Sequence, residues 1–124
     1  MQYAINIYGE DGVFDRLPQA TQDRVMQGHK ALQDALRARG SFASAKLMPP
    51  TSGVILGSTA EFGQKPLVVD GPFSETKEQF LGFYAAEFRD LDEALEFAMH
   101  LASPYARIEV RPIAWVGGVL NPDA

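Results

Sequence analysis

One stretch of the chain decides its fold: DGPFSETKEQ, at residues 70–79. It follows an apolar run at residues 66–69 and precedes a second one at residues 80–86. Gly71 can take backbone angles that other residues avoid, while Pro72 fixes its own φ and biases Gly71 away from the α region. The pattern therefore predicts a strand, a stiff turn and a second strand.

Asp70 is the residue that this turn holds at the end of the first strand. Two interpretations of its carboxylate stay open. It can build the turn, because aspartate commonly bonds its own backbone two residues on, and local chemistry favours this interpretation. It can also be a functional carboxylate at the edge of a cleft. Beyond it, Ser74 is expected to cap a short helical turn that reaches Gln79.

The same stretch resembles the DGPF-domain, YCII-related family. The resemblance rests on DGPF at residues 70–73, ETKEQ at 75–79, GFY at 82–84 and DLDEA at 90–94, and the similarity extends over most of the chain. It implies a ferredoxin-like α+β domain that pairs into a dimeric barrel. It implies little about activity, because the biochemical function of the family is largely unestablished.

Periodicity predicts the remaining elements. Tyr3, Ile5 and Ile7 alternate with more polar residues, which is typical of a strand. Asp90 and Glu93 form a capping-box-like pair in front of an apolar helical stripe. The predicted strands are at residues 2–8, 42–47, 54–56, 66–69, 80–88 and 108–115, with helices at 18–39 and from 90 to Ser103-Pro104.

The predicted order of elements is β-α-β, an extra hairpin, and a second β-α-β. It predicts a single α+β domain over residues 1–124. Two helices cover only one face of such a sheet, and the other face must meet water or a partner. The strands carry apolar groups on both faces, so we expect a face-to-face homodimer. Such a dimer would enclose a cavity between the two sheets.

Composition limits the functions that the chain can have. A hydrophobic content of 46% is ample for one core, and the net charge of −5 disfavours direct nucleic-acid or anionic-membrane binding. There is no cysteine, and residues 1–5 lack the basic start of a signal peptide. No apolar stretch approaches the length of a membrane helix. We expect a cytoplasmic protein with no membrane partner.

His29 is the most informative ionisable side chain outside the turn. It lies on one helical stripe with Val25, Leu32 and Leu36, so it points toward the sheet. An imidazole there can serve as general acid or base, or it can be a core histidine with a hydrogen-bond partner. The resemblance implies more, because a His–Asp dyad has been proposed in some relatives. Carried over to this chain, the catalytic pair is His29 with Asp70.

Several other residues are candidates for ligand contact. They are Gly71, Pro72, Phe73, Tyr84 and Arg111. Arg111 and Glu109 are expected on the face opposite Ile108 and Val110, where an ion pair is favoured over anion binding. We expect no metal and no cofactor, because the two histidines are far apart and no phosphate-binding fingerprint occurs.

Two functional hypotheses follow. The first is a small-molecule site between the sheets of the dimer, with lyase-like or isomerase-like acid–base chemistry by the His–Asp pair. The second is a non-enzymatic accessory or regulatory dimer with a protein partner. It follows from the resemblance, which implies a link to sigma-factor-dependent transcription.

Overall fold

The computed structural model describes residues 1–73 and 77–118. Its strands are β1 (Gln2–Glu10), β2 (Phe42–Lys46), β3 (Val54–Leu56), β4 (Val68–Asp70), β5 (Glu78–Glu87) and β6 (Arg107–Pro112). Its α-helices are α1 (Val13–Arg16), α2 (Gln19–Arg39) and α3 (Leu91–Ala98), and two 3-10 turns are η1 (Pro50–Ser52) and η2 (Met99–Leu101).

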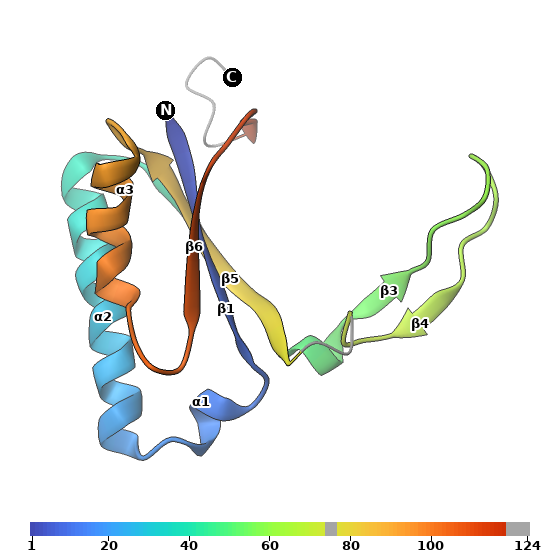
Figure 1. The fold of residues 1–124 in the computed structure, drawn as a ribbon, viewed down its shortest axis with the longest axis horizontal. Coiled ribbons are helices and arrows are strands. Elements are labelled where there is room, and N and C mark those ends of the chain that lie inside the picture. Colours follow the sequence, from blue (N-terminus) through green and yellow to red (C-terminus); the bar gives the residue numbers. More distant parts are fainter. Residues whose placement is uncertain (74–76, 119–124) are drawn as a thin grey trace.

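Four of the strands form one antiparallel sheet in the order β2-β5-β1-β6. Helix α2 connects β1 to β2, and α3 connects β5 to β6. Both helices lie on the same side of the sheet (Figure 1). This is the predicted ferredoxin-like α+β arrangement, while the dimeric barrel that the resemblance implies stays a prediction.

The strand register separates the residues of the two sheet faces, because side chains alternate along a strand. One row across the sheet, on the helix side, consists of Ser44, Tyr84, Ile5 and Val110. The next row, on the opposite face, consists of Ala43, Ala85, Ala4 and Arg111. We call this opposite face, which carries neither α2 nor α3, the open face.

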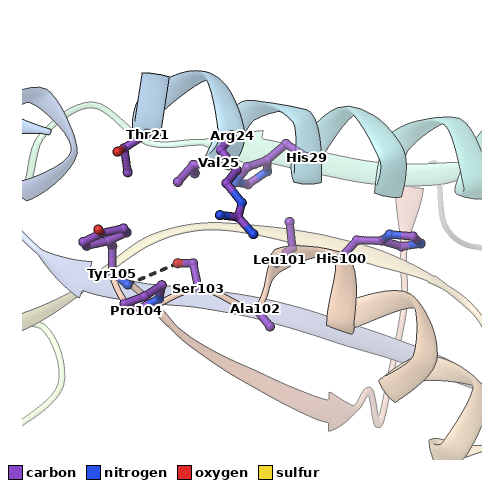
Figure 2. A pocket seen from close by; sticks show the side chains of 10 residues that line it. All are labelled: Thr21, Arg24, Val25, His29, His100, Leu101, Ala102, Ser103, Pro104 and Tyr105. Carbon is purple, nitrogen blue, oxygen red and sulfur yellow. Dashed lines mark hydrogen bonds between the residues drawn. The ribbon is translucent and has the colours of Figure 1, made fainter. Parts of the chain in front are cut away.

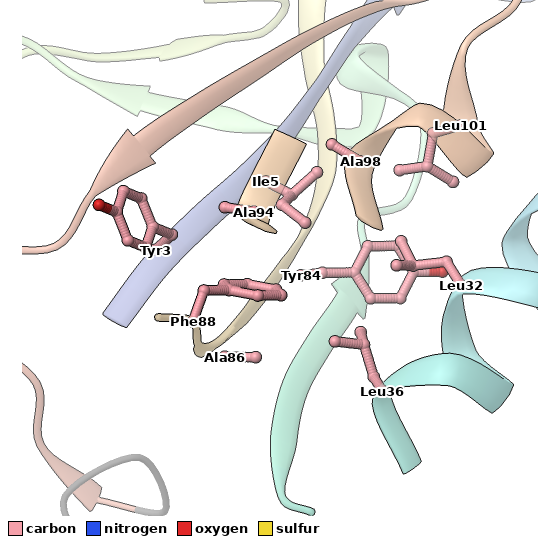
Figure 3. Close-up of a cluster of buried hydrophobic side chains, with 10 residues drawn as sticks. All are labelled: Tyr3, Ile5, Leu32, Leu36, Tyr84, Ala86, Phe88, Ala94, Ala98 and Leu101. Atoms are coloured by element: carbon pink, nitrogen blue, oxygen red, sulfur yellow. The ribbon is translucent and has the colours of Figure 1, made fainter. Parts of the chain in front are cut away.

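The core lies between the sheet and helices α2 and α3 (Figure 3). Leu32 and Leu36 of α2 are buried in it, as the predicted helical stripe requires. At the end of α2, the guanidinium of Arg39 covers the ring of Phe88 at 5.1 Å and pairs with Glu93 at 2.8 Å. The buried cluster is Tyr3, Ile5, Leu32, Leu36, Tyr84, Ala86, Phe88, Ala94, Ala98 and Leu101.

Helix α3 begins as its sequence predicts. The Asp90 carboxylate accepts a hydrogen bond from the backbone N–H of Glu93 at 2.9 Å. The Glu93 carboxylate accepts one in return from the backbone N–H of Arg89 at 3.0 Å. The Asp90 side chain thus satisfies a backbone donor that the first turn of a helix leaves without a partner, and the Glu93 side chain fixes the residue before the cap.

Strands β3 and β4 form a separate two-stranded hairpin, the arm, which projects away from the sheet (Figure 1). The predicted pairing of these strands is confirmed. The arm exposes an unusual number of large apolar side chains, namely Val54, Leu56, Phe62, Leu67, Val68 and Val69. Asp70 ends β4, opposite Val54.

Some boundaries differ from the prediction. Strand β5 starts at Glu78, because Glu78 and Gln79 pair with Glu10 and Gly9 of β1. The helical turn expected to reach Gln79 is therefore wrong at its end, and its predicted cap, Ser74, lies outside the described residues. A short helix, α1, occupies part of the segment that was expected to be a plain connection.

Candidate functional site

The side chains of His29, Tyr84 and Gln33 meet between α2 and β5. The Nδ1 atom of His29 lies 2.8 Å from the hydroxyl of Tyr84, and the Gln33 amide N–H donates to the same hydroxyl at 3.0 Å. His29 and Gln33 are four residues apart, so they lie on one face of α2. Tyr84 is 2% exposed and reaches this face from the centre of the sheet.

The direction of the Gln33 hydrogen bond favours one tautomer of His29. A buried hydroxyl proton needs an acceptor, and the Tyr84 oxygen already accepts from Gln33. Tyr84 therefore donates its proton to Nδ1 of His29. In the neutral ring the remaining proton is then on Nε2, so His29 can offer a ligand a neutral N–H donor.

The surroundings keep the imidazole neutral. Burial lowers the pKa of His29, since it disfavours the charged ring, and the positive charge of Lys46 lowers this pKa further. Lys46 is at the end of β2, opposite Gly82 of β5. At neutral pH the site accordingly contains a neutral imidazole.

A cavity of about 430 Å³ opens beside His29 (Figure 2). It lies between α2 and the segment that joins η2 to β6. Both polar and apolar residues line it. The lining residues are Thr21, Arg24, Val25, His29, His100, Leu101, Ala102, Ser103, Pro104 and Tyr105.

Gly28 explains how the two walls of this cavity come so close. A Cβ atom at Gly28 would overlap the carbonyl oxygen of His100 in η2. Only glycine allows this approach of α2 to η2. The position of a glycine inside a helix, which costs about 1 kcal/mol relative to alanine, thus has a packing reason.

Asp70, the predicted partner of His29, lies elsewhere in the chain. It is exposed at the end of β4, in the arm, whereas α2 lies across the sheet from the arm (Figure 1). Within the described chain the two residues are not brought together. The partner that the structure gives to the His29 ring is Tyr84.

The predicted ligand-contact residues divide among three places. Tyr84 is at the His29 site, and Phe73 lines a second cavity of about 560 Å³ at the base of the arm. Gly71 is adjacent to that cavity and donates its N–H to the Gly53 carbonyl at 2.7 Å, and the Gly71–Pro72 bond is cis. A side chain at Gly71 would clash with the backbone oxygens of residues 50 and 53.

Arg111 is on the open face, as predicted. Its guanidinium lies 3.9 Å from the Glu109 carboxylate, which also accepts a hydrogen bond from Asn6 at 3.0 Å. Asn6 is buried, although it is on the open face. These contacts fit the ion pair that the sequence favoured over an anion-binding role.

Sequence reasoning missed three parts of the His29 site. Gln33 could have been found from its spacing of four residues from His29. Arg24 and the segment 103–105 carried no local signal. Their place at the cavity depends on how η2 packs against α2, which is a tertiary contact.

The fold and site define a ferredoxin-like α+β protein with a neutral, hydrogen-bonded imidazole at a cavity. The model of the YCII-related domain matches residues 1–114. The chain is also 39% identical over 118 residues to an uncharacterised protein of Rhizobium meliloti (strain 1021), with 92% of this chain and 93% of that protein aligned. The chain belongs to the YCII-related family. Within its described residues, no helix combines the length and apolar character that crossing a membrane requires.

Proposed function

We propose that the protein binds a small molecule at His29 and donates a hydrogen bond to it from the imidazole. The observation that carries this proposal is the contact of 2.8 Å between His29 and Tyr84 at the wall of a cavity. It fixes the ring, selects its tautomer and leaves Nε2 for the ligand.

This arrangement suits a reaction in which negative charge develops on an oxygen atom of the ligand. The Nε2–H of His29 would donate to that oxygen and stabilise the charge, as preorganised donors do in many active sites. Tyr84 and Gln33 would act as positioning residues, because they hold the ring through Nδ1. Lyase-like and isomerase-like reactions proceed through such oxyanions.

This role for His29 does not require Asp70. The pairing of His29 with Asp70 stays a prediction, and the proposed chemistry assigns the orientation of the ring to Tyr84 instead. Asp70 suits the turn-building interpretation, since it ends β4 directly before Gly71 and Pro72.

We also propose that the chain forms a homodimer through the open face. Its rows contain the small residues Ala43, Ala85 and Ala4, which let a second sheet approach closely. Apolar burial stabilises association by about 25 cal/mol per Å². His29 is on the helix side, so we place one site in each subunit and not between the two sheets.

The accessory or regulatory dimer is the second candidate, and the arm is the observation that favours it. Exposed apolar side chains on both strands of a projecting hairpin are typical of surfaces that contact proteins. A pull-down from a native lysate tests this candidate. Recovery of a sigma factor by the wild-type chain, and its loss in Leu67→Asp, would support it, whereas recovery of no regulator would count against it.

The His29 proposal is tested with His29→Gln in a thermal-shift screen of small organic compounds. A ligand that binds only the folded protein raises its melting temperature, so hits on the wild-type chain report binding. We expect the hits to disappear in His29→Gln. The control is Lys30→Gln, which removes only an exposed ion pair with Asp34 on the same helix. Equal hits in His29→Gln and the wild type would remove His29 from the site.

A further inference from the structure

The cavity beside His29 differs in charge from the rest of the protein. The whole chain has a net charge of −5, yet none of the described residues that line this cavity is acidic. Arg24 lines it, and Lys46 is near enough to lower the pKa of His29. The cavity is therefore a positively charged site on an acidic protein.

Arg24 has no ion pair in the part of the chain that the structure describes, and this distinguishes it from most arginines here. Five others pair with carboxylates: Arg37, Arg39, Arg89, Arg107 and Arg111. Figure 2 shows the Arg24 side chain extending from α2 toward the facing segment that bears Ser103. Its guanidinium is thus directed across the cavity.

The other polar groups of the cavity are also able to donate. The Ser103 hydroxyl oxygen accepts from the backbone N–H of Tyr105 at 3.1 Å, which leaves the hydroxyl proton for another acceptor (Figure 2). Thr21 supplies a second hydroxyl, and the Nε2–H of His29 supplies a third donor. The walls between them are apolar, formed by Val25, Leu101, Ala102 and Pro104.

We propose that this cavity binds a small organic carboxylate, whose carboxylate group pairs with Arg24 and whose carbon skeleton lies against the apolar walls. The inference rests on the proposed function, since the ligand is the one on which His29 would act. A guanidinium matches the two oxygens of a carboxylate in a bidentate pair. A phosphate dianion fits less well, because among the described lining residues Arg24 is the one permanent cation.

The test uses the full chain and two panels of probes. One panel contains four carboxylates, namely acetate, butyrate, benzoate and succinate, together with inorganic phosphate. The other panel contains the amides of the four carboxylic acids. Binding is measured by calorimetry at neutral pH and low salt, for the wild type, Arg24→Gln and Arg37→Gln. Arg37→Gln is the matched control, because it makes the same change on the same helix outside the cavity.

We expect at least one carboxylate to bind and its amide to bind about tenfold more weakly or worse, as the loss of a charged hydrogen bond implies. Arg24→Gln should weaken binding of the carboxylate by about the same factor, while Arg37→Gln should leave its Kd within about twofold of the wild-type value. Absence of carboxylate binding, equal binding of the amide, preference for phosphate, or an unchanged Kd in Arg24→Gln would each overturn the inference.

The outcomes also separate this inference from the proposed function. A neutral compound that binds through His29 with no effect of Arg24→Gln would leave the proposed function standing and remove the carboxylate class. A carboxylate that depends on Arg24 but binds His29→Gln as tightly as the wild type would support the binding site and remove His29 from its chemistry.

Discussion

The hydroxyl of Tyr84 lies 2.8 Å from Nδ1 of His29, and this contact joins β5, one of the two inner strands of the sheet, to the long helix α2. The two residues are 55 positions apart in the sequence. The tyrosine is buried and the histidine borders a cavity, so one contact belongs both to the core and to the candidate site. Changes at either residue should therefore affect stability and ligand binding together.

Removing the hydroxyl in Tyr84→Phe should destabilise the protein by about 1–3 kcal/mol, because Gln33 and Nδ1 of His29 lose a buried partner. Urea unfolding measures this change. Tyr3→Phe is the control, since Tyr3 is also buried, and in the described structure no hydrogen bond of its hydroxyl is found. Equal stability of Tyr84→Phe and the wild type would contradict the proposed network.

His29 should also make the stability depend on pH. Its pKa in the folded state is lowered by burial and by Lys46, whereas in the unfolded chain it is about 6.5. Below pH about 6.5 the unfolded state therefore binds more protons, and the contribution of His29 to stability is lost as the pH falls through the folded pKa. Above that range the contribution is fully present.

The measurement is urea unfolding at several pH values between pH about 7.5 and 5. Compared with the wild type, His29→Gln should lose less stability over this range, because glutamine does not titrate but can still accept a hydrogen bond from Tyr84. Lys46, which lowers the pKa of His29, and Arg24, which lines the same cavity, are unchanged in this variant. Parallel curves for the two proteins would show that His29 does not have a lowered pKa.

Local sequence patterns predicted much of the fold. The Asp90–Glu93 cap and the stripe through Leu32 and Leu36 could be predicted because capping and helical periodicity depend on neighbouring residues. The contact of His29 with Tyr84 could not, since it depends on the register of β5 and on the way α2 crosses the sheet. The direction of the arm, which takes Asp70 away from α2, likewise has no local signal.

Gly28→Ala tests the close packing of α2 against η2. Alanine favours a helix by about 1 kcal/mol over glycine, so an unpacked position would become more stable. Here the new methyl group would overlap the His100 carbonyl, and we expect a net destabilisation of about 1–3 kcal/mol. Thermal unfolding measures it, with Gln27→Ala on the exposed face of α2 as the control. A higher melting temperature in Gly28→Ala would mean that η2 moves aside without cost.

The proposed homodimer can be tested with a charge on the open face. Ala45 is exposed there, in one row with Phe83 and Asn6, so Ala45→Glu leaves the core intact and places a carboxylate where the second sheet would lie. An unpaired charge is costly to bury, and we expect the dimer to weaken by about tenfold or more.

Sedimentation equilibrium measures the dissociation constant. Ala38→Glu on the exposed side of α2 is the matched control and should stay dimeric. A monomeric wild-type chain would refute the dimer, and an unchanged dissociation constant in Ala45→Glu would show that the subunits associate through another surface.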